Sequence, residues 1–277
     1  MEHPGGVVTY QSPLLRSLGV VHAFSTRIGG HSPPPFNSMN LGNPTGCDVQ
    51  DENANLEENY RRLMNAIGAA PMLRAWVKQV HGRSVELLER EPEGEYGETL
   101  EAEIRDRFCG QISADAIVTS VPNVLLTVRI ADCVPILIAS RDGKIVAAIH
   151  AGWRGVVGDV VGKAVRGMRE AGAPADGLVA AIGPCISLEH FEVGPEVAEE
   201  FVRQGLGHAV QSFPDKNPHI DLQASVKALL GRTGVTQIDG NDLCTFRDAD
   251  TFYSHRRDNG ITGRMAAVIG IPAERAC

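Results

Sequence analysis

The stretch VPILIASRDGKIVAAIH, residues 134–150, holds the clearest local structural signal in the chain. Two apolar runs flank Asp142-Gly143, and such a pair between apolar runs is typical of a β-hairpin. If these are the two turn residues, His150 faces Pro135 across the hairpin. Cys133 then lies diagonally from His150 on the same face, roughly 7–8 Å away. The turn chemistry alone therefore predicts a thiol and an imidazole close together.

Other apolar and amphipathic stretches surround this hairpin. Their periodicity predicts strands at 20–24, 75–81, 114–119, 124–131, 178–183, 235–238 and 265–269. Helices are expected at 51–67, 155–171, 195–204 and 222–230. The acidic stretch 86–106 is expected to be a solvated loop or hairpin tip. No break marks two independent units, so we expect one domain over residues 1–277.

Composition narrows the class of protein. The 277 residues include 26 basic and 34 acidic side chains, a net charge of −8, and only 5% aromatic residues. This balance disfavours a general nucleic-acid binder, although a local basic pocket is compatible with it. No apolar run has the length of a membrane span, and the first residues lack a secretory signal. The six cysteines form no C-x-x-C pair, which favours free thiols and a cytoplasmic location.

Three side chains stand out as candidates for chemistry: His81, Cys133 and His150. Each lies at or just beyond the end of an apolar run and is followed by turn residues. Two imidazoles and a thiolate suit tetrahedral Zn²⁺ and leave a fourth position open, and the same donors also bind copper. The spacing leaves other readings open. Each residue alone fits an ordinary core position, and a structural metal site would need a fourth ligand such as Cys185.

A metal-free alternative is a Cys133 nucleophile with His150 as its base, oriented by Asp132 or Asp115. Separately, the turn 151–155 carries Arg154, a guanidinium suited to phosphate. Further arginines in polar or glycine-rich loops, Arg27 and Arg256, belong to the same class of candidate anion contacts. The zinc deaminase signature H-x-E…P-C-x-x-C is absent from the sequence.

Several motifs occur together and in order along nearly the whole chain. They are Thr26-Arg27-x-Gly29-Gly30, Asn40-Leu41-Gly42, Gln79-Val80-His81-Gly82, Ala131-Asp132-Cys133-Val134-Pro135, His150-Ala151-Gly152-Trp153-Arg154-Gly155, Ile182-Gly183-Pro184-Cys185-Ile186 and Arg256-Arg257-Asp258. In these motifs the sequence resembles the YfiH/laccase-domain family of purine nucleoside enzymes, long labelled polyphenol oxidases. Small departures are His255, where the family more often has Tyr, and Ser25, where Thr is more usual.

The resemblance implies an α/β fold of two back-to-back mixed sheets flanked by helices. It implies a zinc site of His81, Cys133 and His150. It also implies phosphorolysis of adenosine, inosine and S-methyl-5′-thioadenosine to the free base and a ribose 1-phosphate, with adenosine deamination as a side activity. The expected partners are a purine nucleoside and phosphate, without nucleic acid or membrane. The oligomeric state is not predicted.

The leading hypothesis is therefore a zinc-dependent purine nucleoside phosphorylase. Its expected substrate and phosphate contacts are Arg27, Asn40, Gln79, Arg154 and Arg256, with backbone N–H groups of residues 152–155 near the phosphate. Asp132 and Asp258 are candidates for a general acid. The rivals are a copper-dependent polyphenol oxidase, which the nine scattered histidines disfavour, and a metal-free Cys–His hydrolase.

Overall fold

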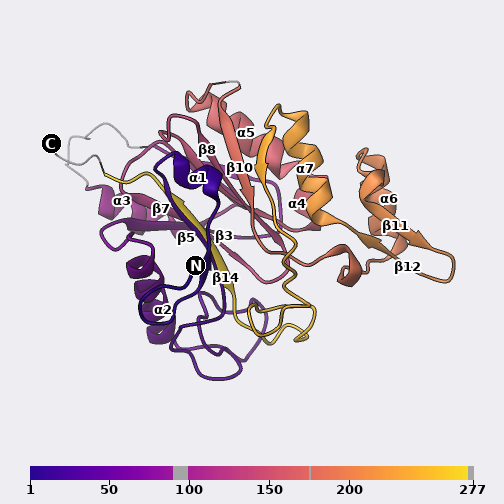
Figure 1. The fold of residues 1–277 in the computed structure, drawn as a ribbon, viewed down its shortest axis with the longest axis horizontal. Helices are drawn as coiled ribbons and strands as arrows, with labels where there is room; N and C mark the ends of the chain where they lie inside the picture. Colours follow the sequence, from indigo (N-terminus) through magenta and orange to yellow (C-terminus); the bar gives the residue numbers. More distant parts are fainter. Residues whose placement is uncertain (90–98, 175, 274–277) are drawn as a thin grey trace.

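Two six-stranded mixed β-sheets lie face to face in the computed structural model, which describes residues 1–89, 99–174 and 176–273 (Figure 1). Sheet I has the order β1 (Thr9–Tyr10), β2 (Val21–Ser25), β14 (Met265–Gly270), β7 (Val124–Ile130), β3 (Leu73–Lys78), β5 (Cys109–Ser113). Sheet II has the order β13 (Gln237–Asp239), β10 (Leu178–Ile182), β8 (Val134–Ser140), β9 (Val146–Ala151), β6 (Ala116–Thr119), β4 (Val85–Leu88). The single α/β fold class with two mixed sheets is confirmed.

Helices lie over the outer faces of the sheets and beside the layer between them (Figure 1). The helices are α1 (Pro13–Ser17), α2 (Asn53–Ala66), α3 (Leu100–Arg107), α4 (Trp153–Val157), α5 (Val160–Glu170), α6 (Pro195–Arg203) and α7 (Leu222–Arg232), with 3-10 turns at Leu188–His190 and Gly207–Ala209. Leu15 of α1 and Ile104 of α3 pack into the layer between the sheets. Helix α2 packs Leu63 against sheet I, whereas α5 and α7 pack on sheet II. Helix α6 and the hairpin β11 (Val210–Phe213) and β12 (Lys216–Ile220) project to one side.

The strand sequences explain why both faces of each sheet are buried. Along β8, Ile136 and Ile138 face the helices, while Leu137 and Ala139 face the other sheet. Successive side chains of a strand point to opposite faces, so a strand between two apolar layers must be apolar throughout. All seven residues of β8 are buried. The continuous apolar runs in the sequence therefore mark strands inside a four-layer helix–sheet–sheet–helix packing.

The hairpin of residues 134–150 forms with the predicted register but with a different turn. Pro135 pairs with His150, as expected. The loop spans four residues, since Ser140 N–H donates to the Ile145 carbonyl at 2.8 Å. Of the Asp142-Gly143 pair, only Gly143 has a positive φ, whereas a two-residue type I′ turn needs it at both positions. A two-residue loop and a four-residue loop that are both centred between Asp142 and Gly143 give the same strand register. The predicted pairing of Pro135 with His150 is therefore confirmed.

Three short segments carry the chain from sheet I to sheet II. They join β3 to β4, β5 to β6 and β7 to β8, through residues 79–84, 114–115 and 131–133 respectively. Strands β5 and β7 both run parallel to β3, so the carboxyl ends of all three strands lie on the same side of sheet I. The three crossings consequently lie together, and they contain His81, Asp115 and Cys133.

Some expected elements were wrong in their bounds. The helix predicted at 155–171 is two helices, because Asp159 has a left-handed φ of 56° and caps Gly162 N–H. Within the acidic stretch 86–106, residues 86–88 belong to β4 and 100–107 form α3, while 90–98 lie outside the described residues. The short strands β1, β5, β11 and β12 were not predicted. No helix among the described residues is long and apolar enough to cross a membrane.

Candidate active site

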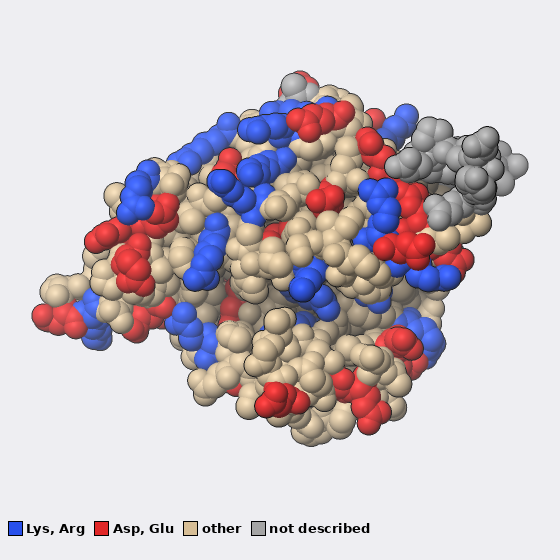
Figure 2. Space-filling view, turned by 180° about the vertical axis from the view of Figure 1, so that it is seen from behind, with Lys and Arg blue, Asp and Glu red and all other residues tan. Residues whose placement is uncertain are grey.

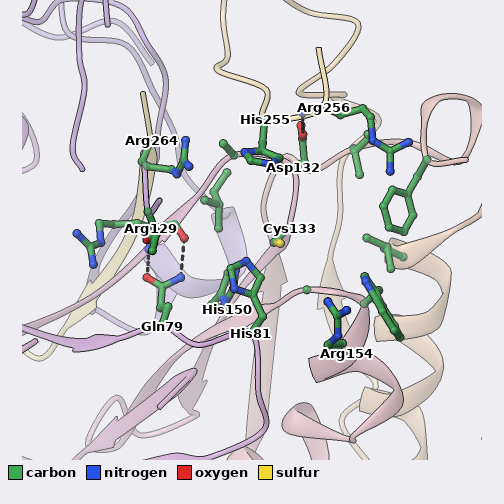
Figure 3. A pocket seen from close by; sticks show the side chains of 18 of the residues that line it. Gln79, His81, Arg129, Asp132, Cys133, His150, Arg154, His255, Arg256 and Arg264 are labelled. Atoms are coloured by element: carbon green, nitrogen blue, oxygen red, sulfur yellow. Dashed lines mark hydrogen bonds between the residues drawn. The ribbon is translucent and has the colours of Figure 1, made fainter. Parts of the chain in front are cut away.

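The side chains of His81, Cys133 and His150 converge at the crossings between the sheets (Figure 3). Their ligand atoms all lie within 4.8 Å of one another, and the two imidazole rings stand edge to face with centroids 4.9 Å apart. The predicted proximity of Cys133 and His150 is confirmed, and His81 joins them. Cys185 is not a member of this group, so nothing in it corresponds to a fourth thiol ligand.

A buried carboxylate, Asp115, orients two of these three residues. Its Oδ1 lies 2.8 Å from His150 Nδ1 and accepts the His81 N–H at 3.0 Å, while Oδ2 accepts the Gly82 N–H at 2.6 Å. With Nδ1 committed to the carboxylate, Nε2 is the ring nitrogen of His150 left for a ligand. His81 has a left-handed φ of 56°, a conformation in which these backbone bonds hold it. Asp115 was one of two candidates for this orienting role.

The electrostatics of the group favour a thiolate. Burial alone would raise the pKa of Cys133, but the neighbouring imidazoles of His150 and His81 lower it to about 6. Burial would likewise lower the pKa of His150, but Cys133 and Asp115 raise it to about 9. Asp115 has a lowered pKa despite its burial because His150 and backbone N–H groups stabilise its anion. These shifts favour a thiolate at Cys133 beside an imidazolium at His150.

The backbone leaves room for this cluster at Gly152. A Cβ atom there would lie 3.2 Å from Cys133 Sγ and 3.2 Å from His81 Cδ2. Any larger residue would press on two of the three donor side chains. One soft thiolate and two imidazoles, one of them bonded to a carboxylate, are a donor set that suits zinc or copper. The residues present thus fit a metal ion with an open coordination position.

A pocket of about 310 Å³ opens beside the cluster and combines basic with apolar walls. Of the five predicted substrate contacts, Gln79, Arg154 and Arg256 line it, whereas Arg27 and Asn40 do not. Lining residues that the sequence did not single out as contacts include Arg129, Arg264, Trp153, Phe191 and Leu222. In the view of Figure 2, Lys and Arg side chains gather around a hollow in the surface although the net charge is −8.

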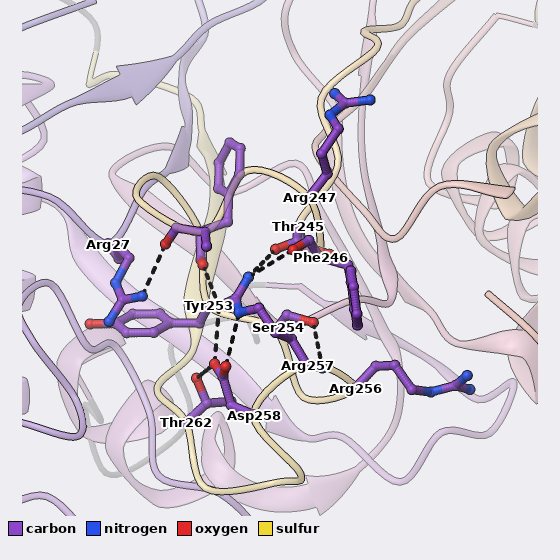
Figure 4. A network of polar contacts seen from close by, with 12 residues as sticks. Arg27, Thr245, Phe246, Arg247, Tyr253, Ser254, Arg256, Arg257, Asp258 and Thr262 are labelled. Atoms are coloured by element: carbon purple, nitrogen blue, oxygen red, sulfur yellow. Dashed lines mark hydrogen bonds and ion pairs between the residues drawn. The ribbon is translucent and has the colours of Figure 1, made fainter. Parts of the chain in front are cut away.

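The Arg27 side chain does not line the pocket and is bound to other parts of the chain (Figure 4). Its guanidinium donates to the carbonyls of Asn37 and Ala249 at 2.8–3.0 Å and lies 4.6 Å from the centre of the Tyr253 ring. Asn40 is fully buried and donates to Asp51 at 3.0 Å. Both side chains hold loops around the pocket and do not line it.

The two candidate general acids are also engaged in structure. Asp132 accepts hydrogen bonds from Thr245 Oγ1 at 2.6 Å and from Arg256 N–H at 2.7 Å. It therefore ties the loop of residues 245–256 to the pocket wall. Asp258 pairs with Arg257 at 2.9 Å and accepts from Thr262 (Figure 4). Neither carboxylate is a free acid at the cluster.

With the fold and this pocket in place, the class of protein is an α/β protein with a three-ligand candidate metal site. A family model described as "Multi-copper polyphenol oxidoreductase laccase" matches residues 21–272, and the chain belongs to that family. It is 39% identical to the "Purine nucleoside phosphorylase" of Deinococcus radiodurans over 94% of this chain and 93% of the relative. It is 36% identical to "Purine nucleoside phosphorylase YfiH" of Escherichia coli over 91% and 93%.

Solved structures agree with this assignment. A Neisseria meningitidis protein described as family DUF152 superposes with a TM-score of 0.80 at 32% identity, over 96% of this chain and 99% of that one. YlmD from Geobacillus stearothermophilus gives a TM-score of 0.81 at 29% identity, over 99% and 98%. The resemblance to the YfiH/laccase-domain family is thereby confirmed.

Proposed function

We propose that this protein is a purine nucleoside phosphorylase that holds a zinc ion through His81, Cys133 and His150. The observation that carries the proposal is the three-ligand cluster at the wall of a pocket lined by four arginines. Curated relatives named purine nucleoside phosphorylase support the same activity. Adenosine, inosine and S-methyl-5′-thioadenosine are the proposed substrates, with adenosine deamination as a side activity and the reducing cytoplasm as the compartment.

The reaction needs few groups from the protein. A phosphate oxygen bonds to C1′ of the ribose while the C1′–N9 bond breaks, and the purine leaves with the electron pair and takes up a proton. Guanidinium groups in the pocket neutralise the phosphate and hold it in place. Asp115 orients the His150 imidazole and holds the backbone of His81. A bound zinc ion would supply Lewis-acid polarisation of a substrate oxygen.

Product analysis tests this proposal directly. Inosine, adenosine and S-methyl-5′-thioadenosine are incubated with the protein, with and without phosphate. Free base and ribose 1-phosphate formed only with phosphate support phosphorolysis, and inosine formed from adenosine without phosphate supports deamination. Metal analysis is expected to give about one zinc per chain, with activity lost on chelation and regained with zinc. Full activity in metal-free protein would contradict the zinc assignment.

A second candidate function is a metal-free hydrolase, which one observation favours. Cys133, His150 and Asp115 form a chain of nucleophile, base and orienting carboxylate. Under this hypothesis, activity persists in chelator and stops when an electrophile alkylates Cys133. Under the leading hypothesis, zinc protects Cys133 and chelation stops turnover. The copper-oxidase hypothesis predicts oxygen uptake with a phenol that ceases on copper removal.

A further inference from the structure

The four arginines of the pocket lie at two separate ends (Figure 3). Arg129 and Arg264 are on one side of the His–Cys–His cluster, and Arg154 and Arg256 are on the other. Arg129 and Arg264 are half-buried, whereas Arg154 and Arg256 are exposed. The His–Cys–His cluster therefore lies between two pairs of arginines that differ in burial.

Arg264 is fixed from several directions. Its backbone N–H donates to Asn40 Oδ1 at 2.9 Å, and its carbonyl accepts the Leu41 N–H at 2.9 Å. Its Nη1 donates to the carbonyls of Thr262 and Gly263 at 2.9 and 3.0 Å. No partner within the described part of the chain is recorded for its Nε and Nη2. The guanidinium is thus anchored by one nitrogen and presents the others to the pocket.

The backbone of Arg129 is held by the side chain of Gln79. The side chain of Gln79 accepts the Arg129 N–H at 2.8 Å through Oε1 and donates to the Arg129 carbonyl at 2.7 Å through Nε2. Gly42 makes room for the side chain, since a Cβ there would lie 2.7 Å from Arg129 Cδ. Within residues 1–89, 99–174 and 176–273, no hydrogen bond or ion pair of the Arg129 guanidinium is recorded.

Within the part of the chain that the structure describes, neither guanidinium at this end forms a direct ion pair. Asp132 acts on Arg264 through its charge alone, since its oxygens accept hydrogen bonds from Thr245 and Arg256. Burial and the charge of Arg129 lower the pKa of Arg264, while Asp132 and Cys133 oppose this shift. Two neighbouring half-buried guanidiniums are unfavourable unless an anion joins them. Planar guanidinium groups suit the oxygens of phosphate.

The opposite end offers flat surfaces. Arg154 lies 4.2 Å from the centre of the Trp153 ring, and Arg256 lies 5.4 Å from that of Phe191. Aromatic rings and guanidinium planes stack on purines. Phe191, Trp153 and Leu222 all line the pocket. This wall is suited to a neutral planar base more than to a dianion.

We infer that Arg129 and Arg264 form the phosphate subsite, with the purine base on the Trp153–Phe191 side and the ribose between them at the cluster. The assignment rests on the proposed phosphorylase function and moves the phosphate away from Arg154 and residues 152–155. It also gives Asn40 and Gln79 positioning roles, since Asn40 holds the backbone of Arg264 and Gln79 that of Arg129.

The experiment measures phosphate dependence in Arg129→Gln, Arg264→Gln and Gly42→Ala. Gly42→Ala displaces the Arg129 side chain without removing a charge. Each variant is expected to raise the KM for phosphate roughly 10- to 100-fold and to change the KM for inosine much less. Arg154→Gln and Arg256→Gln are expected to show the reverse pattern. Arg166→Gln, an exposed arginine of α5, is the matched control, and thermal melting identifies variants that do not fold.

Phosphorus NMR titration with inorganic phosphate alone separates this inference from the proposed function. Phosphorolysis with an unchanged phosphate KM in folded variants would overturn the subsite and leave the phosphorylase standing. Phosphate binding that is lost in Arg129→Gln and Gly42→Ala would support the subsite even if no nucleoside is cleaved. Absence of phosphate binding by the wild-type protein at millimolar concentration would overturn it.

Discussion

Oδ1 of Asp115 lies 2.8 Å from Nδ1 of His150, and both residues are buried. The same carboxylate also accepts the backbone N–H of His81. One anion therefore orients two of the three proposed metal ligands from a third crossing between the sheets.

Replacing Asp115 by Asn is expected to weaken zinc binding. The amide keeps the size of the side chain but removes the charge that faces His150 and the backbone N–H groups of residues 80–82. Loss of a carboxylate that orients a metal-binding histidine lowers metal affinity roughly 10- to 100-fold. Competition with a chromophoric chelator measures the change. Asp142→Asn, in the exposed hairpin turn, is the control, and equal affinity in both variants would contradict the role of Asp115.

In metal-stripped protein, Cys133 is expected to react with iodoacetamide at a lower pH than an ordinary thiol. The thiolate is the reactive form, and the lowered pKa of about 6 makes it predominant above that pH. The rate with iodoacetamide should rise between pH 5 and 7, whereas an ordinary thiol becomes reactive near pH 8.5. Site-resolved mass spectrometry follows Cys133 apart from the other cysteines. Added zinc is expected to block the reaction, and a midpoint above pH 8 would refute the electrostatic argument.

Gly152→Ala is expected to damage the metal site while leaving the fold intact. Its φ of −73° is open to alanine, so the effect arises from the new methyl group near Cys133 Sγ and His81 Cδ2. Zinc affinity should fall at least several-fold with little loss of secondary structure by circular dichroism. Gly231→Ala is the matched substitution, because a Cβ there meets nothing within 4 Å. Comparable zinc affinities for the two variants would exclude steric protection by Gly152.

Truncation of Leu137 is expected to destabilise the whole molecule. Leu137 is fully buried in the layer between the two sheets. Leu→Ala at such a site lowers the free energy of unfolding by about 2–5 kcal/mol, because of lost apolar burial and the cavity that remains. Urea denaturation of metal-stripped protein measures this. Val202→Ala, at a position that is 58% exposed, should change stability by less than about 0.5 kcal/mol.

Turn residues and apolar periodicity predicted the parts of the fold that depend on residues close in sequence. The register that places Pro135 opposite His150 follows from turn chemistry and strand periodicity, so it could be predicted without tertiary information. The break between α4 and α5 could not be predicted, because the same apolar stripe is present on both sides of Gly158 and Asp159. The architecture of two sheets came from the family resemblance, since periodicity does not say which strands pair.

The site shows the same division. His81 and Cys133 lie on two neighbouring crossings between the sheets and His150 at the end of β9, and no sequence spacing encodes that meeting. Arg129 was missed as a pocket residue because it is the only charged residue of the apolar strand β7. Such an isolated charge carries no sequence pattern that indicates a binding site. Arg27 was expected to bind an anion because it is an arginine in a glycine-rich loop, yet nearby carbonyls already occupy its donors.

The placement of the cluster at the crossings has a mechanical consequence. His81 and Cys133 lie where the chain leaves sheet I, and His150 lies within sheet II. A ligand that binds all three side chains would therefore brace the two layers against sliding over each other. Because such a ligand binds the folded arrangement and not the unfolded chain, a loaded site would also stabilise the packing of the two sheets against unfolding.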